Sequence, residues 1–341
     1  MINKKSVIGI EVNSDKVTLT EVEKKEKAVV VTKFSEVQLD INVVKDNIIV
    51  DFLKLAKQLK QVLVEEKFSA KDIVVSMNNN LFLKRCELIK DSSTGNLVDT
   101  LENAVSESYL FLHDAFQLGY KSFIPLTKVS MNLNSQSTTS QSGNDHKTKN
   151  TVVYSAVSAS AIHSIQQMAL ELDKNLTAID LSPLAMLRAM LWQQKCSHKP
   201  QLTLIIDEQY IDLNIVYNGD ILLSHVFRKK IDHVLENQSV ASGYYQIIKQ
   251  LLLSFQSRYP QLETPKTLIG FSRLNNAQLF LERLADELSI ELKLYDVLSN
   301  TNFLVKTHDA KKNNYIAKTY LAAIGLAYKA FEPADKSLSF I

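Results

Sequence analysis

Apolar and polar residues alternate at the start of the chain. The alternation covers residues 7–22 and is interrupted by the polar triplet Asn13-Ser14-Asp15, which predicts a β-hairpin with its tip at the triplet. Residues 28–34 predict a third strand. From Ile48 to Leu63 the apolar residues recur at steps of three and four, which predicts a helix with one buried face. Residues 72–77 are rich in β-branched side chains and predict the next strand.

The residues from 81 to 133 break this order and predict a separate small subdomain of strands and one helix. Its strand-like runs are 81–89, 116–124 and 127–133, and its helix pattern extends from Leu97 to Leu112. Residues 134–150 are polar, and we expect them to form a solvated, flexible loop whose deletion costs little stability.

Beyond this loop, strands and helices alternate regularly. The expected elements are, in chain order, strand 151–157, helix 160–173, strand 176–181, a helix opened by Pro183, strands 201–207, 210–220 and 221–227, helix 239–258, strand 267–271, helix 277–288, strand 290–296 and helix 315–331. The dipeptide Asn218-Gly219 marks a tight turn between two of these strands.

The second hairpin repeats the first. Setting Glu11 against Asp207 aligns two hairpins, each with an acidic residue at the end of its first strand and with a third strand after it. Two such units in one chain predict an α/β, actin-like fold of two lobes. In that fold the two hairpin tips face each other across a nucleotide cleft.

The composition excludes several classes of function. With 39 basic and 37 acidic residues the net charge is +2, and no half of the chain is strongly basic, so nucleic acid is not an expected partner. None of the eight glycines lies in a GxG or P-loop pattern, which excludes the Walker and Rossmann nucleotide sites. The two cysteines, Cys86 and Cys196, fit a reducing compartment. We expect neither a signal peptide nor a membrane span, and therefore a cytoplasmic protein.

Several segments, taken in order, resemble one family. These segments are Gly9-Ile10-Glu11, the strand VVYSAV with the later TAIDLSPLAMLRAM, the hairpin IIDEQYIDLNIVYNGD and the closing LAAIGLAYKAF. Over residues 7–331 the chain resembles the PilM-like branch of the actin fold, which comprises cytosolic pilus-assembly proteins related to the division protein FtsA. The run Phe116-Gln117-Leu118-Gly119-Tyr120 is similar to the strand signature of the subdomain that this branch inserts into its first lobe.

The resemblance implies a domain organisation. The implied parts are a first-lobe core at 1–80 and 151–182, an inserted α+β subdomain at 81–133, the polar loop at 134–150, a second lobe at 183–331 and a tail at 332–341. The upper subdomain of the second lobe is expected to be reduced, because only a short stretch separates Phe227 from Ile247.

The resemblance also implies a set of candidate cofactor-binding residues: Glu11, Asn13, Asp180 and Asp207. The corresponding acidic residues of actin-type ATPases place Mg²⁺ or a water between the lobes. Three interpretations stay open here, namely catalysis, nucleotide binding without turnover, and a structural role in which Asp180 and Asp207 cap the turn or helix that follows them.

The hairpin tips depart from the family pattern that binds ATP. Glycine-rich tips let backbone N–H groups approach a phosphate. Here the two tips are Asn13-Ser14-Asp15 and Glu208-Gln209-Tyr210, and Gly270-Phe271-Ser272-Arg273 stands where the family has a glycine-rich adenosine loop. Glu208 would repel a phosphate, and Tyr210 would fill its space. We therefore expect a degenerate, vestigial nucleotide cleft with no catalytic residue, no metal site and no requirement for ATP or Mg²⁺.

These features lead to the hypothesis of a non-enzymatic scaffold. The resemblance, which extends to the reduced MshI protein of the mannose-sensitive haemagglutinin pilus, implies binding to the short cytosolic tail of an inner-membrane PilN-like protein and to other pilus assembly components. The chain would then be cytoplasmic and peripheral at the inner membrane through this partner. An FtsA-type ATPase and the cytoplasmic domain of a GspL-like secretion protein stay open as alternatives, although the tail EPADKSLSFI is too short and polar for the membrane helix of FtsA-like proteins.

Overall fold

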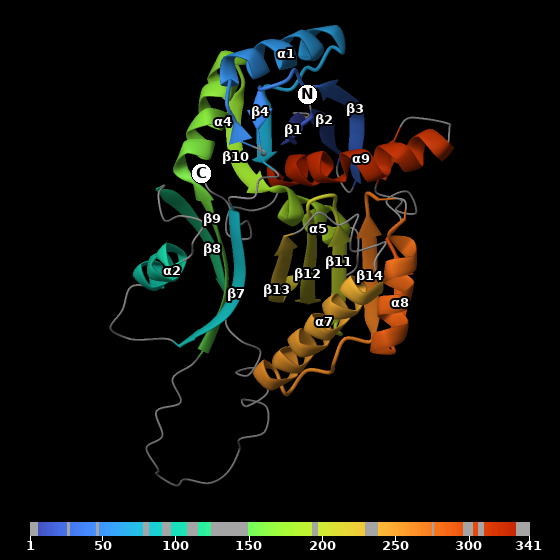
Figure 1. Ribbon diagram of the computed structural model, residues 1–341. Coiled ribbons are helices and arrows are strands. Elements are labelled where there is room, and N and C mark those ends of the chain that lie inside the picture. Colours follow the sequence, from blue (N-terminus) through green and yellow to red (C-terminus); the bar gives the residue numbers. More distant parts are fainter. Residues whose placement is uncertain are drawn as a thin grey trace.

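The computed structural model of the chain describes residues 6–25, 28–45, 48–77, 82–90, 97–107, 115–123, 149–192, 197–228, 238–274, 276–295, 303–305 and 310–331. Two large β-sheets, each with helices against it, lie one above the other in Figure 1, and a third, smaller sheet stands beside them. The two predicted hairpins belong to different large sheets, as a two-lobed fold requires.

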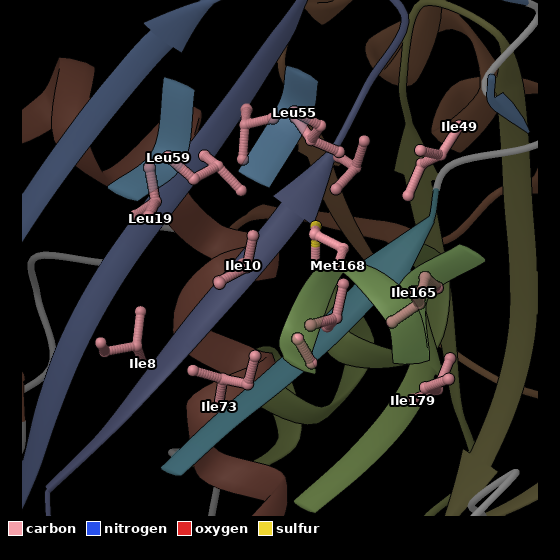
Figure 2. Packing of buried hydrophobic residues seen from close by; sticks show 14 of the residues in the cluster. Ile8, Ile10, Leu19, Ile49, Leu55, Leu59, Ile73, Ile165, Met168 and Ile179 are labelled. Atoms are coloured by element: carbon pink, nitrogen blue, oxygen red, sulfur yellow. The ribbon is translucent and has the colours of Figure 1, made fainter. Parts of the chain in front are cut away.

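The first sheet has the strand order β10-β6-β1-β2-β3-β16. Its strands are β1 (Ser6–Val12), β2 (Lys16–Lys25), β3 (Ala28–Gln38), β6 (Asp72–Met77), β10 (Asn175–Leu181) and β16 (Phe303–Val305). One face is covered by α1 (Phe52–Glu65) and α4 (Ala159–Glu171). Figure 2 shows how the alternate strand residues Ile8, Ile10 and Leu19 meet side chains of these helices, such as Leu55 and Met168, because one face of each strand is apolar.

The start of α1 differs from the prediction. Ile48 and Ile49 form the short strand β5 (Ile48–Ile49), which pairs with β4 (Val44–Lys45), instead of the first turn of a helix. The helix begins at Phe52, because the side chain of Asp51 accepts a hydrogen bond from the Lys54 N–H at 2.8 Å and caps its N-terminus. Periodicity alone could not separate two apolar strand residues from a helical stripe that they happen to continue.

The second sheet repeats the order of the first. Its order is β13-β12-β11-β14-β15, formed by β11 (Gln201–Ile206), β12 (Tyr210–Tyr217), β13 (Asp220–Arg228), β14 (Thr267–Ser272) and β15 (Glu291–Leu294). In both sheets the hairpin's first strand pairs antiparallel with its second strand and parallel with a later strand. The helices α7 (Gln238–Arg258) and α8 (Gln278–Leu288) cover one face. The internal repeat predicted from Glu11 and Asp207 is therefore confirmed.

The inserted subdomain is a three-stranded sheet backed by one helix. It consists of β7 (Phe82–Lys90), β8 (Phe116–Phe123), β9 (Lys149–Ser158) and α2 (Leu97–Ser106), in the order β7-β9-β8. The central strand β9 lies in the stretch that the expected boundaries divided between the polar loop, 134–150, and the first-lobe core, 151–182. Because β9 pairs with both other strands, the insert extends to Ser158.

Two helices fill the space between the large sheets. They are α5 (Ser182–Trp192) and α9 (Ala310–Lys329), and Figure 1 shows α9 crossing the molecule between the two sheets. Their core contains residues of both sheets, such as Val7 and Val74 of the first and Ile205 and Ile269 of the second. Residues 303–305 and 310–329, expected in the second lobe, instead pair with β3 and pack on β1, β2 and β6 of the first sheet.

Some expectations concern residues outside the described part of the chain. These are the strand at 127–133, the flexibility of 134–148, the end of the helix pattern at Tyr109 and Leu112, and the tail 332–341. Within the described residues, none of the helices is long and apolar enough to cross a membrane.

Backbone-to-backbone contacts hold α9 in place. A Cβ atom added to Gly9 of β1 would lie 1.8 Å from the carbonyl oxygen of Ala323, and one added to Gly325 would lie 1.8 Å from the carbonyl oxygen of Ala185 on α5. Glycine therefore allows α9 to approach a strand on one side and a helix on the other. Gly9 and Gly325, which belong to no phosphate-binding pattern, are thus required for close packing.

We predict that Gly325→Ala destabilises the chain by about 1–3 kcal/mol or more, since the added methyl group must push α9 away from α5. Gly243→Ala is the matched control, because this helical glycine of α7 has no atom within 4 Å of an added Cβ. That control should be neutral or stabilise the chain by up to about 1 kcal/mol, because alanine is the better helix former. Urea unfolding of both variants measures the difference. Equal stability of the two variants would contradict the close contact.

Candidate functional site

Glu11 lies at the end of β1, where the first sheet faces the second. Its side chain is fully buried. One carboxylate oxygen, Oε2, accepts a hydrogen bond of 3.2 Å from the hydroxyl of Thr18, the residue opposite Glu11 on β2. The nearby tip residue Asn13 donates its backbone N–H to the Lys16 carbonyl at 2.9 Å. This N–H therefore closes the hairpin turn.

Asp207 follows β11 at the corresponding place in the second sheet. Its N–H donates to the carbonyl of Tyr210 at 2.9 Å, and its Oδ1 accepts the Glu208 N–H at 2.7 Å. The Asp207 side chain is 5% exposed, whereas Glu208 points to solvent. The charge of Glu208 nevertheless acts on Asp207, so the repulsion of a phosphate by Glu208 stays a prediction, and Tyr210 is buried beside Asp207.

Arg273 joins these two acidic residues. It comes directly after β14, and its N–H donates to the carbonyl of Ile206 at 3.1 Å, which places it next to Asp207. Its guanidinium nitrogens lie 2.7 Å from Oε2 of Glu11 and 3.1 Å from Oδ2 of Asp207. One cation of the second sheet thus contacts a carboxylate from each sheet. We call Glu11, Asp207 and Arg273 the central cluster.

Burial and the neighbouring charges act in opposite directions on the central cluster. Burial opposes the charge of Arg273, but Glu11 and Asp207 outweigh it and raise the pKa of the guanidinium above its ordinary value. Burial also raises the pKa of Asp207, and Arg273 offsets that rise only in part because Glu11 and Glu208 are nearby. The site therefore favours the positive charge of Arg273 and disfavours any further negative charge.

In the sequence, Arg273 stands out only as the last residue of Gly270-Phe271-Ser272-Arg273, whose first three residues belong to β14. A signal for it existed, because β11 and β14 are parallel neighbours and the carboxyl ends of parallel neighbours meet at one edge of a sheet. A charged residue directly after β14 must then lie close to Asp207. What the sequence could not show is that its side chain extends to Glu11 in the other sheet.

Asp180 does not join the central cluster. It lies near the end of β10, where its Oδ1 accepts the Leu181 N–H at 2.8 Å. Its Oδ2 lies 2.6 Å from Arg188 of α5 and 3.4 Å from Lys329 of α9. Burial would raise the pKa of Asp180, but these two cations outweigh burial and hold the pKa below its ordinary value. Asp180 thus connects the first sheet to both central helices.

The geometry defines what the candidate residues can do. Each of the three acids has an internal cation beside it, so a metal ion or a nucleotide would have to displace Arg273 from Glu11 and Asp207. Within the described residues, no group of three or more His, Cys, Asp or Glu side chains is placed to hold a metal ion.

Comparisons with known proteins place this geometry in a structural context. No family model and no curated protein matches the sequence. Among solved structures, a PilM-PilN type IV pilus biogenesis complex contains a chain that is 16% identical, with a TM-score of 0.67 over 96% of this chain and 99% of that chain. A protein of unknown function with an actin-like ATPase fold, from Bacteroides thetaiotaomicron, has a TM-score of 0.44 at 11% identity over 89% of this chain and 96% of that chain. The ethanolamine utilization protein EutJ from Carboxydothermus hydrogenoformans has a TM-score of 0.41 at 10% identity, with coverages of 96% and 91%. The predicted fold class is confirmed: the chain has a two-lobed, actin-like α/β fold of the PilM type.

Proposed function

We propose that this protein is a cytoplasmic scaffold of a type IV pilus-like assembly machine, and that it binds the cytosolic tail of an inner-membrane PilN-like protein. The likeness to a chain of the PilM-PilN complex carries this proposal, because it extends over nearly the whole length of both chains. Through this partner the protein would be peripheral at the inner membrane and would contact other pilus assembly components.

We propose in addition that the nucleotide cleft is degenerate, and the central cluster supports this. An ATP site needs acids that are free to hold Mg²⁺ and N–H groups that are free to hold phosphate. Here Arg273 contacts both acids, and the N–H groups of Asn13 and Asp207 close their own turns. Breaking a buried ion pair costs about 3–5 kcal/mol, which weakens binding by more than a hundredfold.

The outer edge of β8 is the place that we propose for the partner's tail. The Ala159 N–H donates to the Ala115 carbonyl at 2.7 Å, which sets the phase of the β8–β9 ladder. Antiparallel pairs alternate, so residues 118, 120 and 122 direct their N–H and C=O groups away from β9. No strand of the described part of the chain pairs with this edge. An extended tail can add there as a further strand.

The side chains beside this edge fit an extended peptide. Leu118 packs against the small core of the insert, which contains Leu101 and Val105 of α2, and Tyr120 of the same face is 41% exposed. A tail that pairs with β8 would place every second side chain on this apolar face. Main-chain hydrogen bonds would supply affinity, and contacts with Leu118 and Tyr120 would supply selectivity.

An FtsA-type ATPase is the second candidate function, favoured by the acids Glu11 and Asp207 at the two hairpin tips. A GspL-like secretion domain is the third, and the choice of partner separates it from a pilus scaffold. The gene beside this one gives the partner: a reading frame with one membrane span and a short cytosolic N-terminus supports the pilus proposal.

We predict that a labelled peptide of that N-terminal tail binds the protein and that Tyr120→Pro weakens binding at least about tenfold, because proline removes an outward N–H and its hydrogen bond. Tyr120→Thr keeps this N–H and should weaken binding less. Fluorescence anisotropy measures both affinities, and thermal melting confirms that both variants fold. If the wild type fails to bind the tail, the scaffold proposal is wrong. If the proline variant binds as tightly as the wild type, the scaffold stands but its tail docks elsewhere.

We also predict little or no ATP hydrolysis and at most weak, Mg²⁺-dependent nucleotide binding, measured by isothermal titration calorimetry. Arg273→Ala should bind Mg²⁺ more tightly than the wild type does, because it frees Glu11 and Asp207. Lys249→Ala is the control, since Lys249 pairs with Glu287 on the helical face of the second sheet. A micromolar dissociation constant for ATP that disappears in Asp207→Ala would support the ATPase candidate instead.

A further inference from the structure

A second buried cation crosses between the lobes in the opposite direction. Lys84 of β7 belongs to the insert, and its Nζ lies 2.5 Å from Oδ1 of Asp212 on β12 and 3.0 Å from Oδ1 of Asn214. The Asn214 amide in turn donates to the other carboxylate oxygen of Asp212 at 3.0 Å. The side chains of Lys84 and Asp212 are fully buried. Burial lowers the pKa of Lys84 although Asp212 opposes the change.

Further contacts attach the insert to the second sheet around this pair. The Cys86 thiol donates to the carbonyl of Ile221 at 3.4 Å, and the hydroxyls of Thr151 and Tyr259 lie 2.9 Å apart. Arg228 lies over the Phe82 ring, 4.8 Å from its centroid. The insert is joined covalently to the first lobe, so these contacts make it a connection between the lobes.

The two cations occupy equivalent places in the internal repeat. Lys84 lies in the connection between β6 and α4, and Arg273 lies in the connection between β14 and α8, which holds the same position in the second half. Each cation extends from its own half to a carboxylate on the hairpin of the other half, Lys84 to Asp212 and Arg273 to Glu11. The contacts are therefore reciprocal, and each joins the two halves of the chain.

The geometry points to a permanently closed molecule: Arg273 and Lys84 hold the two lobes in one arrangement, and closure requires no nucleotide. Arg273 supplies, from within the chain, the positive charge that a bound cation would bring between Glu11 and Asp207. Removing either cation leaves a buried, unpaired carboxylate, which drives the lobes apart to let water in. This inference does not depend on the pilus partner.

Spin labels on the two outer helical layers test whether the lobes stay in one arrangement. Leu170 of α4 and Leu279 of α8 are 70% and 54% exposed, so Leu170→Cys and Leu279→Cys provide the labelling sites. Cys196→Ser removes one native thiol. Cys86 can remain, because burial raises its pKa to about 12 and keeps it unreactive. Pulsed electron–electron double resonance should give one narrow distribution of distances between the two labels without nucleotide. Mg²⁺ and ATP should leave this distribution unchanged. A broad distribution, or one that shifts with Mg²⁺ and ATP, overturns the inference.

Arg273→Ala should broaden this distribution, whereas the control Lys249→Ala should not. Millimolar guanidinium should restore the narrow distribution of Arg273→Ala, because it refills the space between the two carboxylates. Urea has the same shape and no charge, so it should restore nothing. A narrow distribution in Arg273→Ala, or broadening that guanidinium does not reverse, overturns the role of the guanidinium.

Lys84→Met provides the second test, because it leaves the buried carboxylate of Asp212 without its cation. Its distribution should be broader than that of the wild type. Adding Asp212→Leu removes that charge as well and leaves only the neutral amide of Asn214 without these partners, so the double variant should give a narrower distribution than Lys84→Met. A Lys84→Met variant with the narrow wild-type distribution overturns the role of Lys84.

Discussion

The close approach of α9 to both β1 and α5 is the constraint on which the rest of the structure depends. Glycine at positions 9 and 325 allows these elements to meet backbone to backbone, where any side chain would collide. Because α9 and α5 form a single layer between the sheets, the distance between the sheets is small. Only then can one arginine of the second sheet contact a carboxylate of the first. The ion pairs between the two sheets thus depend on the close packing at Gly9 and Gly325.

That short distance buries carboxylates, and each of them lies beside a cation of the same chain. A buried carboxylate without a partner is strongly destabilising, so Glu11, Asp207 and Asp180 each require a cation. In a nucleotide-dependent protein the bound ligand can provide it. Here Arg273, Arg188 and Lys329 are part of the chain. The acids that suggest an ATPase in the sequence are, in the structure, already paired.

Much of the fold could be predicted because its signals are local or repeated. Alternating residues gave the hairpins, and the match of Glu11 with Asp207 gave the two sheets. Contacts distant in sequence could not be predicted: β16 is three residues long and is a strand only because β3 lies beside it. Glu11 and Asp207 lie at facing strand ends, as the repeat predicted, but the cation between them was missed, since no pattern in one sequence shows where a long side chain extends.

The arrangement of the insert connects this closed core to the proposed function. One face of its sheet packs through Lys84 and Cys86 on the second sheet, and the opposite face packs on α2. The strand β7 contacts β13 of the second sheet, whereas no strand of the described residues pairs with the outer edge of β8. A strand that accepts an extended peptide must itself be held still, because ordering it on binding would cost conformational entropy. The buried contacts of the insert provide this order in advance. If both proposals hold, the internal cations serve peptide binding, because they would keep the edge of β8 rigid without a bound ligand.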